Sequence, residues 1–174
     1  THILPLNVHQ INKYWPGQDI TLLGYEELGK LDNLPDNVSV EIVGNQVDFG
    51  KSWSNAIIPY FRNALEDYFV VIMDDAILMN QVDTKRMDRL EKKIQSGEAQ
   101  KAVIGGGLPL ELTTRLPDGL LAFNEGIDYR CTLHPSIWAK EYFLKYLKPN
   151  MTPWDFEVRN NHIAMYDGAQ IITD

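Results

Sequence analysis

Cysteine, positive charge and long apolar runs are all scarce in this sequence of 174 residues. The single cysteine, Cys131, cannot form an internal disulfide, which favours a cytoplasmic location over an oxidising compartment. No window comes near the roughly 18 to 20 uninterrupted apolar residues that a membrane-spanning helix needs. The first residues also differ from the charged and apolar regions of a signal peptide. We therefore expect a soluble protein without a transmembrane segment.

Acidic residues outnumber basic ones, with 24 Asp and Glu against 16 Lys and Arg, so the net charge is −8. This charge repels a polyphosphate backbone, and the basic residues are scattered, whereas nucleic-acid binding needs a basic stripe. We therefore exclude nucleic acid as a partner. A phosphorylated substrate that meets a carboxylate-rich site needs a counter-charge, which a divalent cation can supply.

The composition, 44% hydrophobic and 23% charged, is typical of one globular domain, which we assign to residues 1–174. Apolar runs and period-two alternation predict strands, and apolar residues at spacings of three and four predict helices. The predicted strands are 19–24, 38–43, 68–73, 102–104 and 169–172, and the predicted helices are 4–14, 52–66, 83–95, 135–147 and 153–161. A hairpin excursion is expected at 112–123, around a Pro-Asp-Gly turn. The alternation predicts an α/β domain with a mostly parallel, Rossmann-like central sheet flanked by helices.

The apolar segment 68–73 ends in two adjacent aspartates, Asp74 and Asp75. We expect it to be the central strand, buried on both faces. Ligands of open α/β sheets bind beyond the carboxyl ends of strands, which places both carboxylates in the predicted site. Adjacent carboxylates repel each other unless a cation or hydrogen-bond donors stabilise them, and hard oxygen ligands suit Mg²⁺ or Mn²⁺. The alternative is that the pair caps the next segment or faces solvent in a turn.

Two stretches of the sequence resemble glycosyltransferases of the GT-A fold. The first combines Asn45, the segment GKSWSNAII at 50–58 and the segment DYFVVIMDD at 67–75. In that family an Asn/Gly-rich loop opens a helix, which leads into an apolar strand that ends in an Asp-rich metal motif. The second combines HPSIWAK at 134–140 with LKPNMTPWDFE at 147–157. It is similar to the acceptor-side helix and following acidic motif of little-characterised bacterial and phage glycosyltransferases.

This resemblance implies transfer of a sugar from a nucleotide-diphosphate sugar to a hydroxyl of a carbohydrate or other acceptor. It implies that Asp74 faces the ribose or the metal, that Asp75 ligates Mn²⁺ or Mg²⁺, and that Asp155 or Glu157 stands near the acceptor. The sequence departs from the family in its metal motif, which reads Asp-Asp-Ala instead of Asp-x-Asp. It also opens on a predicted helix where the family has a strand that holds the base, so we expect a domain without the family's first strand and C-terminal segment.

Such a reaction develops negative charge on the leaving phosphate, which a metal held by Asp75 would stabilise. The acceptor hydroxyl loses a proton as it attacks, so a carboxylate on the opposite face of the sugar should act as the general base, with inversion as the implied outcome. Asp155 and Glu157 are the candidates. The sequence slightly favours Asp155, because the first helical turn orients it toward incoming ligand. Asp155 can instead complete a capping box with Thr152.

Aromatic and basic residues near these motifs complete the predicted site. Aromatic faces can stack on a sugar or a base, and basic side chains can hold phosphate oxygens. Isolated basic residues are more often solvated surface, and Trp138, on an apolar helical stripe, is expected in the core. The donor-side candidates are Lys51, Trp53 and Asn55, and the substrate-side candidates are Trp154, Arg130 and His134.

Three other functions compete with this hypothesis. A sugar nucleotidyltransferase would need a Gly-rich, basic loop near the first strand, and the glycines at 105–107 come too late. A non-catalytic carbohydrate-binding or scaffold protein of the same fold is the other main alternative, against which the four carboxylates count. A glycoside hydrolase needs two carboxylates that flank the bond and has no use for a metal-diphosphate motif.

Overall fold

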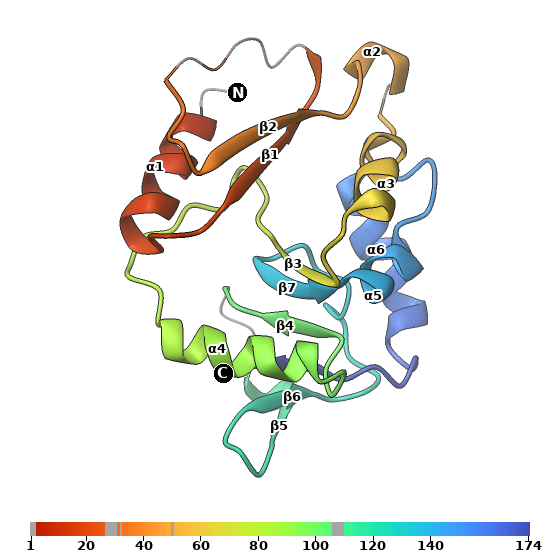
Figure 1. Ribbon diagram of the computed structural model, residues 1–174. Coiled ribbons are helices and arrows are strands. Elements are labelled where there is room, and N and C mark those ends of the chain that lie inside the picture. The colour runs from red at the N-terminus through yellow and green to blue at the C-terminus, as the bar shows by residue number, and fades with distance from the viewer. Residues whose placement is uncertain (1–2, 27–30, 32, 50, 106–109) are drawn as a thin grey trace.

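The protein is described by a computed structural model that covers residues 3–26, 31, 33–49, 51–105 and 110–174 (Figure 1). Its helices are α1 (Leu4–Tyr14), α2 (Gln46–Phe49), α3 (Trp53–Asn63), α4 (Thr84–Gln95), α5 (Lys140–Tyr146) and α6 (Pro153–Ala164). Its strands are β1 (Ile20–Gly24), β2 (Val38–Ile42), β3 (Tyr68–Val71), β4 (Lys101–Val103), β5 (Thr113–Arg115), β6 (Leu121–Phe123), β7 (Ser136–Ala139) and β8 (Ile171–Thr173). The predicted mixed α/β class is confirmed.

The strands form two sheets that lie apart in Figure 1. β1 and β2 make a parallel pair beside α1, and the other six strands form a sheet in the order β3-β7-β4-β8-β6-β5. In the larger sheet only β4 and β8 pair in parallel, and the other four pairings are antiparallel. The prediction of a mostly parallel sheet was therefore wrong.

The difference arises from segment 136–139, which we predicted as the first turn of a helix. It forms β7 instead, inserted between β3 and β4 and antiparallel to both. Ile137 and Trp138 are both fully buried, because the two faces of this strand are covered. A short apolar run of this kind has no periodicity that distinguishes a buried strand from a buried helix. The predicted helix therefore begins only at Lys140, as α5.

The position of β3 is a second correction. Its four residues are half-buried and it ends the strand order, with β7 as its partner. The most deeply buried strands are β4, β7 and β8, so β3 is not the central strand. Its apolar residues are explained by packing, since Phe69 lies 4.6 Å from Phe61 of α3 and 5.4 Å from Phe143 of α5, measured between ring centroids.

Each face of the six-stranded sheet carries its own core. Neighbouring residues of a strand point to opposite faces, and Trp138 and Ile137 of β7 belong to two different apolar clusters. The cluster around Trp138 includes aromatic residues of α3, α5 and α6, and the cluster around Ile137 includes Met87, Leu90 and Ile94 of α4. The predicted helix at 83–95 and the predicted hairpin are confirmed by α4 and by β5 and β6. No helix among the described residues is long and apolar enough to cross a membrane.

Candidate functional site

Two predicted parts of the site lie at the same end of the six-stranded sheet. Val71, the last residue of β3, pairs with Ser136, which also pairs with Val103, the last residue of β4. The carboxyl ends of β3 and β4 therefore lie beside the amino end of β7. Asp74 and Asp75 follow β3, and His134 precedes β7, so all three come to this end of the sheet, and all three are exposed. We call Asp74, Asp75 and His134 the sheet-end group.

The aspartates occupy a turn whose backbone is fixed. The amide of Ala76 donates to the carbonyl oxygen of Met73 at 3.0 Å, and the buried side-chain amide of Asn7, on α1, donates to the carbonyl oxygen of Asp74. Both carboxylates face solvent. The described residues include no group of three or more His, Cys, Asp or Glu that could hold a metal ion alone. Two carboxylates nevertheless fit Mg²⁺ or Mn²⁺, because such ions commonly take one or two carboxylates and complete their shell with water and substrate phosphates.

A cleft of about 510 Å³ lies where the carboxyl ends of β1 and β2 approach the amino ends of α3 and α6. This volume is within the range of small-ligand sites. Trp53 is half-buried and makes a T-shaped ring contact with Phe156, at 6.0 Å between centroids, and Trp154 is 74% exposed. We call this space the aromatic cleft, and it is lined by Tyr25, Gln46, Lys51, Trp53 and residues 152–154 at the start of α6. It brings together three predicted site residues, Lys51, Trp53 and Trp154.

Asn55 is not part of the cleft lining but contacts the turn that precedes Trp154. Its side chain donates to Oδ1 of Asn150 at 2.9 Å and accepts from the backbone amide of Asn150 at 2.9 Å. Next to it, Ser54 and Met151 exchange two hydrogen bonds, one of which involves the Ser54 hydroxyl. Asn150 has a φ of +63°, which an asparagine tolerates better than most residues. Asn55, predicted on the donor side, therefore ties the start of α3 to the turn that leads to Trp154.

Asp155 takes the capping role that the sequence offered as its alternative. Its Oδ2 accepts from the amide and the hydroxyl of Thr152, at 3.0 and 2.8 Å, and its Oδ1 pairs with Arg159 at 2.9 Å. The hydrogen bonds from the Thr152 backbone and side chain hold the pKa of Asp155 below its usual value. Both oxygens are thus engaged within the first turns of α6.

Glu157, the other predicted base, is half-buried one helical turn after Trp154. Its Oε1 accepts from the backbone amide of Leu133 at 2.5 Å and from the hydroxyl of Thr132 at 3.1 Å. The carboxylate therefore contacts the segment that leads directly to His134.

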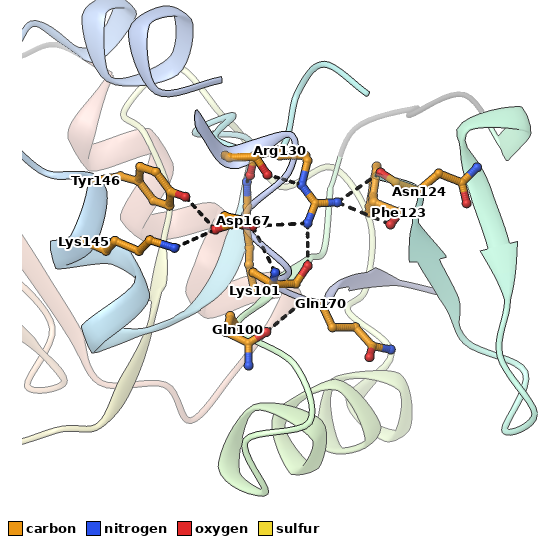
Figure 2. A network of polar contacts seen from close by, with 11 residues as sticks. Gln100, Lys101, Phe123, Asn124, Arg130, Lys145, Tyr146, Asp167 and Gln170 are labelled. Carbon is orange, nitrogen blue, oxygen red and sulfur yellow. Dashed lines mark hydrogen bonds and ion pairs between the residues drawn. The ribbon is translucent and has the colours of Figure 1, made fainter. Parts of the chain in front are cut away.

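Arg130, predicted to hold phosphate, is fully buried and turned into the protein (Figure 2). Its guanidinium donates to the carbonyl oxygens of Ala164 at 2.6 Å, Asn124 at 3.1 Å and Ala169. It also lies 3.6 Å from the carboxylate of Asp167. Through these contacts Arg130 connects the segment before β7 with the segment between α6 and β8 and is not available to bind phosphate.

Sequence reasoning missed Lys101, the first residue of β4, whose side chain is also fully buried. Its Nζ donates to the carbonyl oxygens of Thr132 at 2.6 Å and Arg130 at 3.2 Å, and lies 4.2 Å from the ring centroid of its cross-strand neighbour Trp138. Burial lowers the pKa of Lys101 to about 7. The sequence offers no signal for this position, because a lysine beside an apolar run is normally at the surface.

No protein-family model matches this chain, and no curated protein sequence matches it at a significant level. The class that the fold and the site define is a mixed α/β protein with an aromatic cleft and an exposed pair of carboxylates.

Proposed function

We propose that this protein is a glycosyltransferase that transfers a sugar from a nucleotide-diphosphate sugar to an acceptor hydroxyl, assisted by Mn²⁺ or Mg²⁺. One observation carries the proposal. Lys51 lies just before α3, Trp53 is its first residue, and Trp154 comes from the start of α6. The three line one cleft beside the carboxyl ends of β1 and β2.

The chemistry of the aromatic cleft suits such a donor. The exposed ring of Trp154 and the partly exposed ring of Trp53 offer flat apolar surface on which a base or a sugar can stack. Lys51 is exposed at the same cleft and adds a positive charge for a phosphate oxygen. The cleft therefore combines apolar area with one cation, which a phosphorylated, ring-containing ligand can use at once.

The sheet-end group would supply the second part of the reaction. Asp74 and Asp75 would hold the cation together with donor phosphate oxygens, and the bound cation supplies Lewis-acid stabilisation of the leaving diphosphate. His134 is exposed at the same end of the sheet and is available to contact substrate. Asp155 and Glu157 are the candidate bases that the resemblance implies. Both carboxylates already accept hydrogen bonds from the protein, Asp155 from Thr152 and Glu157 from Leu133.

An activity assay tests this proposal. Wild-type protein is incubated with each of a panel of nucleotide-diphosphate sugars and Mn²⁺, and release of the nucleoside diphosphate is measured with and without a mixture of carbohydrate acceptors. We expect release from one class of donor, accelerated by acceptor and abolished by EDTA and by Asp75→Ala. Absence of release from every donor, in a preparation shown to be folded, would contradict the assignment as a transferase and favour a non-catalytic carbohydrate-binding protein.

A further inference from the structure

The segment 130–134 is held from two sides by the ionisable side chains of Lys101 and Glu157. On one side, Nζ of Lys101 donates to the carbonyl oxygens of Arg130 and Thr132 (Figure 2 shows the bond to Arg130). On the other side, Oε1 of Glu157 accepts from the Leu133 amide and the Thr132 hydroxyl. Lys101 uses only backbone acceptors of the segment, and Glu157 only its donors, so together the two residues fix its backbone from opposite directions.

The hold on this segment reaches His134 directly. The Thr132 hydroxyl donates to Glu157 and accepts from the backbone amide of His134 at 3.3 Å. The Ser136 hydroxyl donates to the carbonyl oxygen of His134 at 2.6 Å. The backbone of His134 is therefore fixed on both sides, while its side chain stays exposed, two residues before β7.

The conformation of the segment is one that requires such support. Tyr129, immediately before it, has a φ of +71°, in the left-handed region that a bulky residue rarely adopts. Strained backbone of this kind persists when surrounding contacts determine it, and it is concentrated at functional sites. The buried Arg130 then anchors the start of the segment to the carbonyl oxygens of Asn124, Ala164 and Ala169.

We infer that Glu157 and Lys101 are positioning residues, which set the place of His134 at the end of the sheet where Asp74 and Asp75 follow β3, and that Glu157 is not the general base. The part of this inference that gives His134 a role toward substrate rests on the proposed function. The part that concerns how Glu157 and Lys101 hold the segment is independent of it. The contacts of Oε1 support it, because this oxygen accepts both hydrogen bonds that Glu157 makes to residues 132 and 133 and is thus engaged by the segment itself.

The test compares a conservative with a disruptive change at the same residue. In Glu157→Gln the side-chain oxygen can still accept from the Leu133 amide and the Thr132 hydroxyl, whereas Glu157→Ala removes the acceptor. Hydrogen exchange of the Leu133 amide is measured in both variants, together with kcat and KM for the best donor. Glu141→Gln and Glu141→Ala, at an exposed position in the first turn of α5, serve as matched controls.

We expect Glu157→Gln to keep slow exchange at Leu133 and to keep kcat within about threefold of the wild type. We expect Glu157→Ala to speed the exchange by about tenfold or more, the change that corresponds to one charge-assisted hydrogen bond. It should also lower kcat more than it raises KM. Thr132→Ser should behave like the wild type, because serine keeps the hydroxyl relay to His134. Thr132→Val should lower kcat as Glu157→Ala does but keep slow exchange at Leu133, because the bond from the Leu133 amide to Glu157 remains.

Two results would overturn the inference. Loss of turnover in Glu157→Gln equal to that in Glu157→Ala, with Leu133 exchange unchanged, would mean that the carboxylate itself does the chemistry. Unchanged exchange in Glu157→Ala would mean that Glu157 does not hold the segment. If the wild type turns over no donor, the proposed function fails separately, and the exchange data together with the histidine NMR resonance of His134 still decide whether Glu157 positions it.

Discussion

Replacement of Arg130 by methionine should destabilise this protein strongly, although the same residue was predicted from the sequence to bind phosphate. The guanidinium has no exposed surface and donates to carbonyl oxygens of Ala164, Asn124 and Ala169. Methionine fills part of the volume but offers no donor. These carbonyl oxygens then lose their partner, and Asp167 loses its nearest guanidinium.

The size of the effect follows from the burial of both partners. The side chains of Arg130 and Asp167 are 0% and 4% exposed. Removing one member of a buried pair typically costs about 3–5 kcal/mol, because the other charge stays buried with less compensation. Asp167 keeps hydrogen bonds from Tyr146 and Lys145, which limits the loss of its stabilisation. We therefore expect the free energy of unfolding to fall by about 3–5 kcal/mol in Arg130→Met, a large share of the stability of a typical domain.

Urea unfolding followed by circular dichroism measures this difference, and Arg89→Met is the matched control. Arg89 pairs with Asp174 at 2.7 Å, but their side chains are 50% and 31% exposed, so loss of this pair should cost less than about 1 kcal/mol. Both substitutions remove one arginine and change the net charge equally. Equal shifts of the two urea midpoints, or a loss of nucleotide-sugar affinity in Arg130→Met without loss of stability, would refute the structural role.

Three further predictions concern other parts of the chain. Burial lowers the pKa of Lys101 to about 7 from 10.5, so between these values the unfolded chain binds more protons and the free energy of unfolding should rise with pH. Lys101→Met should make this rise smaller when urea midpoints are compared at pH 7 and about pH 9. An equal rise in the variant and the wild type would contradict the prediction. Thr152→Ala removes the cap of α6 and should cost about 1 kcal/mol in thermal unfolding, with Thr152→Ser close to wild type; equal stability of the two variants would count against the cap. Trp154→Ala should change the free energy of unfolding by less than about 0.5 kcal/mol but weaken nucleotide-sugar binding, measured by calorimetry, by about 1–3 kcal/mol. Val158, also exposed on α6, is the control, and Val158→Ala should leave binding unchanged.

Elements with strong local patterns could be predicted from the sequence. α4 has Met87, Leu90 and Ile94 on one face and Asp83 as its cap, and it formed within one residue of the predicted bounds. α6 began at Pro153 as predicted but extends to Ala164. Segment 136–139 could not be predicted, because its burial depends on β3 and β4, which flank it in space but not in sequence.

The candidate site was predicted residue by residue but not as an arrangement. Lys51, Trp53 and Trp154 were named individually, and only the folded chain shows that they line one cleft. Tyr25 and Gln46 were missed because each follows a strand without any motif. The roles of Arg130 and Lys101 could not be predicted for another reason. Their partners are backbone carbonyl oxygens of distant segments, and the pattern of side chains along the sequence does not indicate such bonds.

The central claim is that the aromatic cleft and the two aspartates bind a nucleotide sugar together with a metal. Titration calorimetry of the purified protein with UDP, GDP and a panel of nucleotide sugars, each with Mn²⁺ and with EDTA, tests it most directly, with Asp75→Ala compared to Asp88→Ala, an exposed aspartate on α4. We predict that one class of nucleotide binds in Mn²⁺ and not in EDTA, that Asp75→Ala abolishes this binding, and that Asp88→Ala preserves it. Lack of binding by every nucleotide in the presence of metal, or binding that Asp75→Ala leaves unchanged, would contradict the claim.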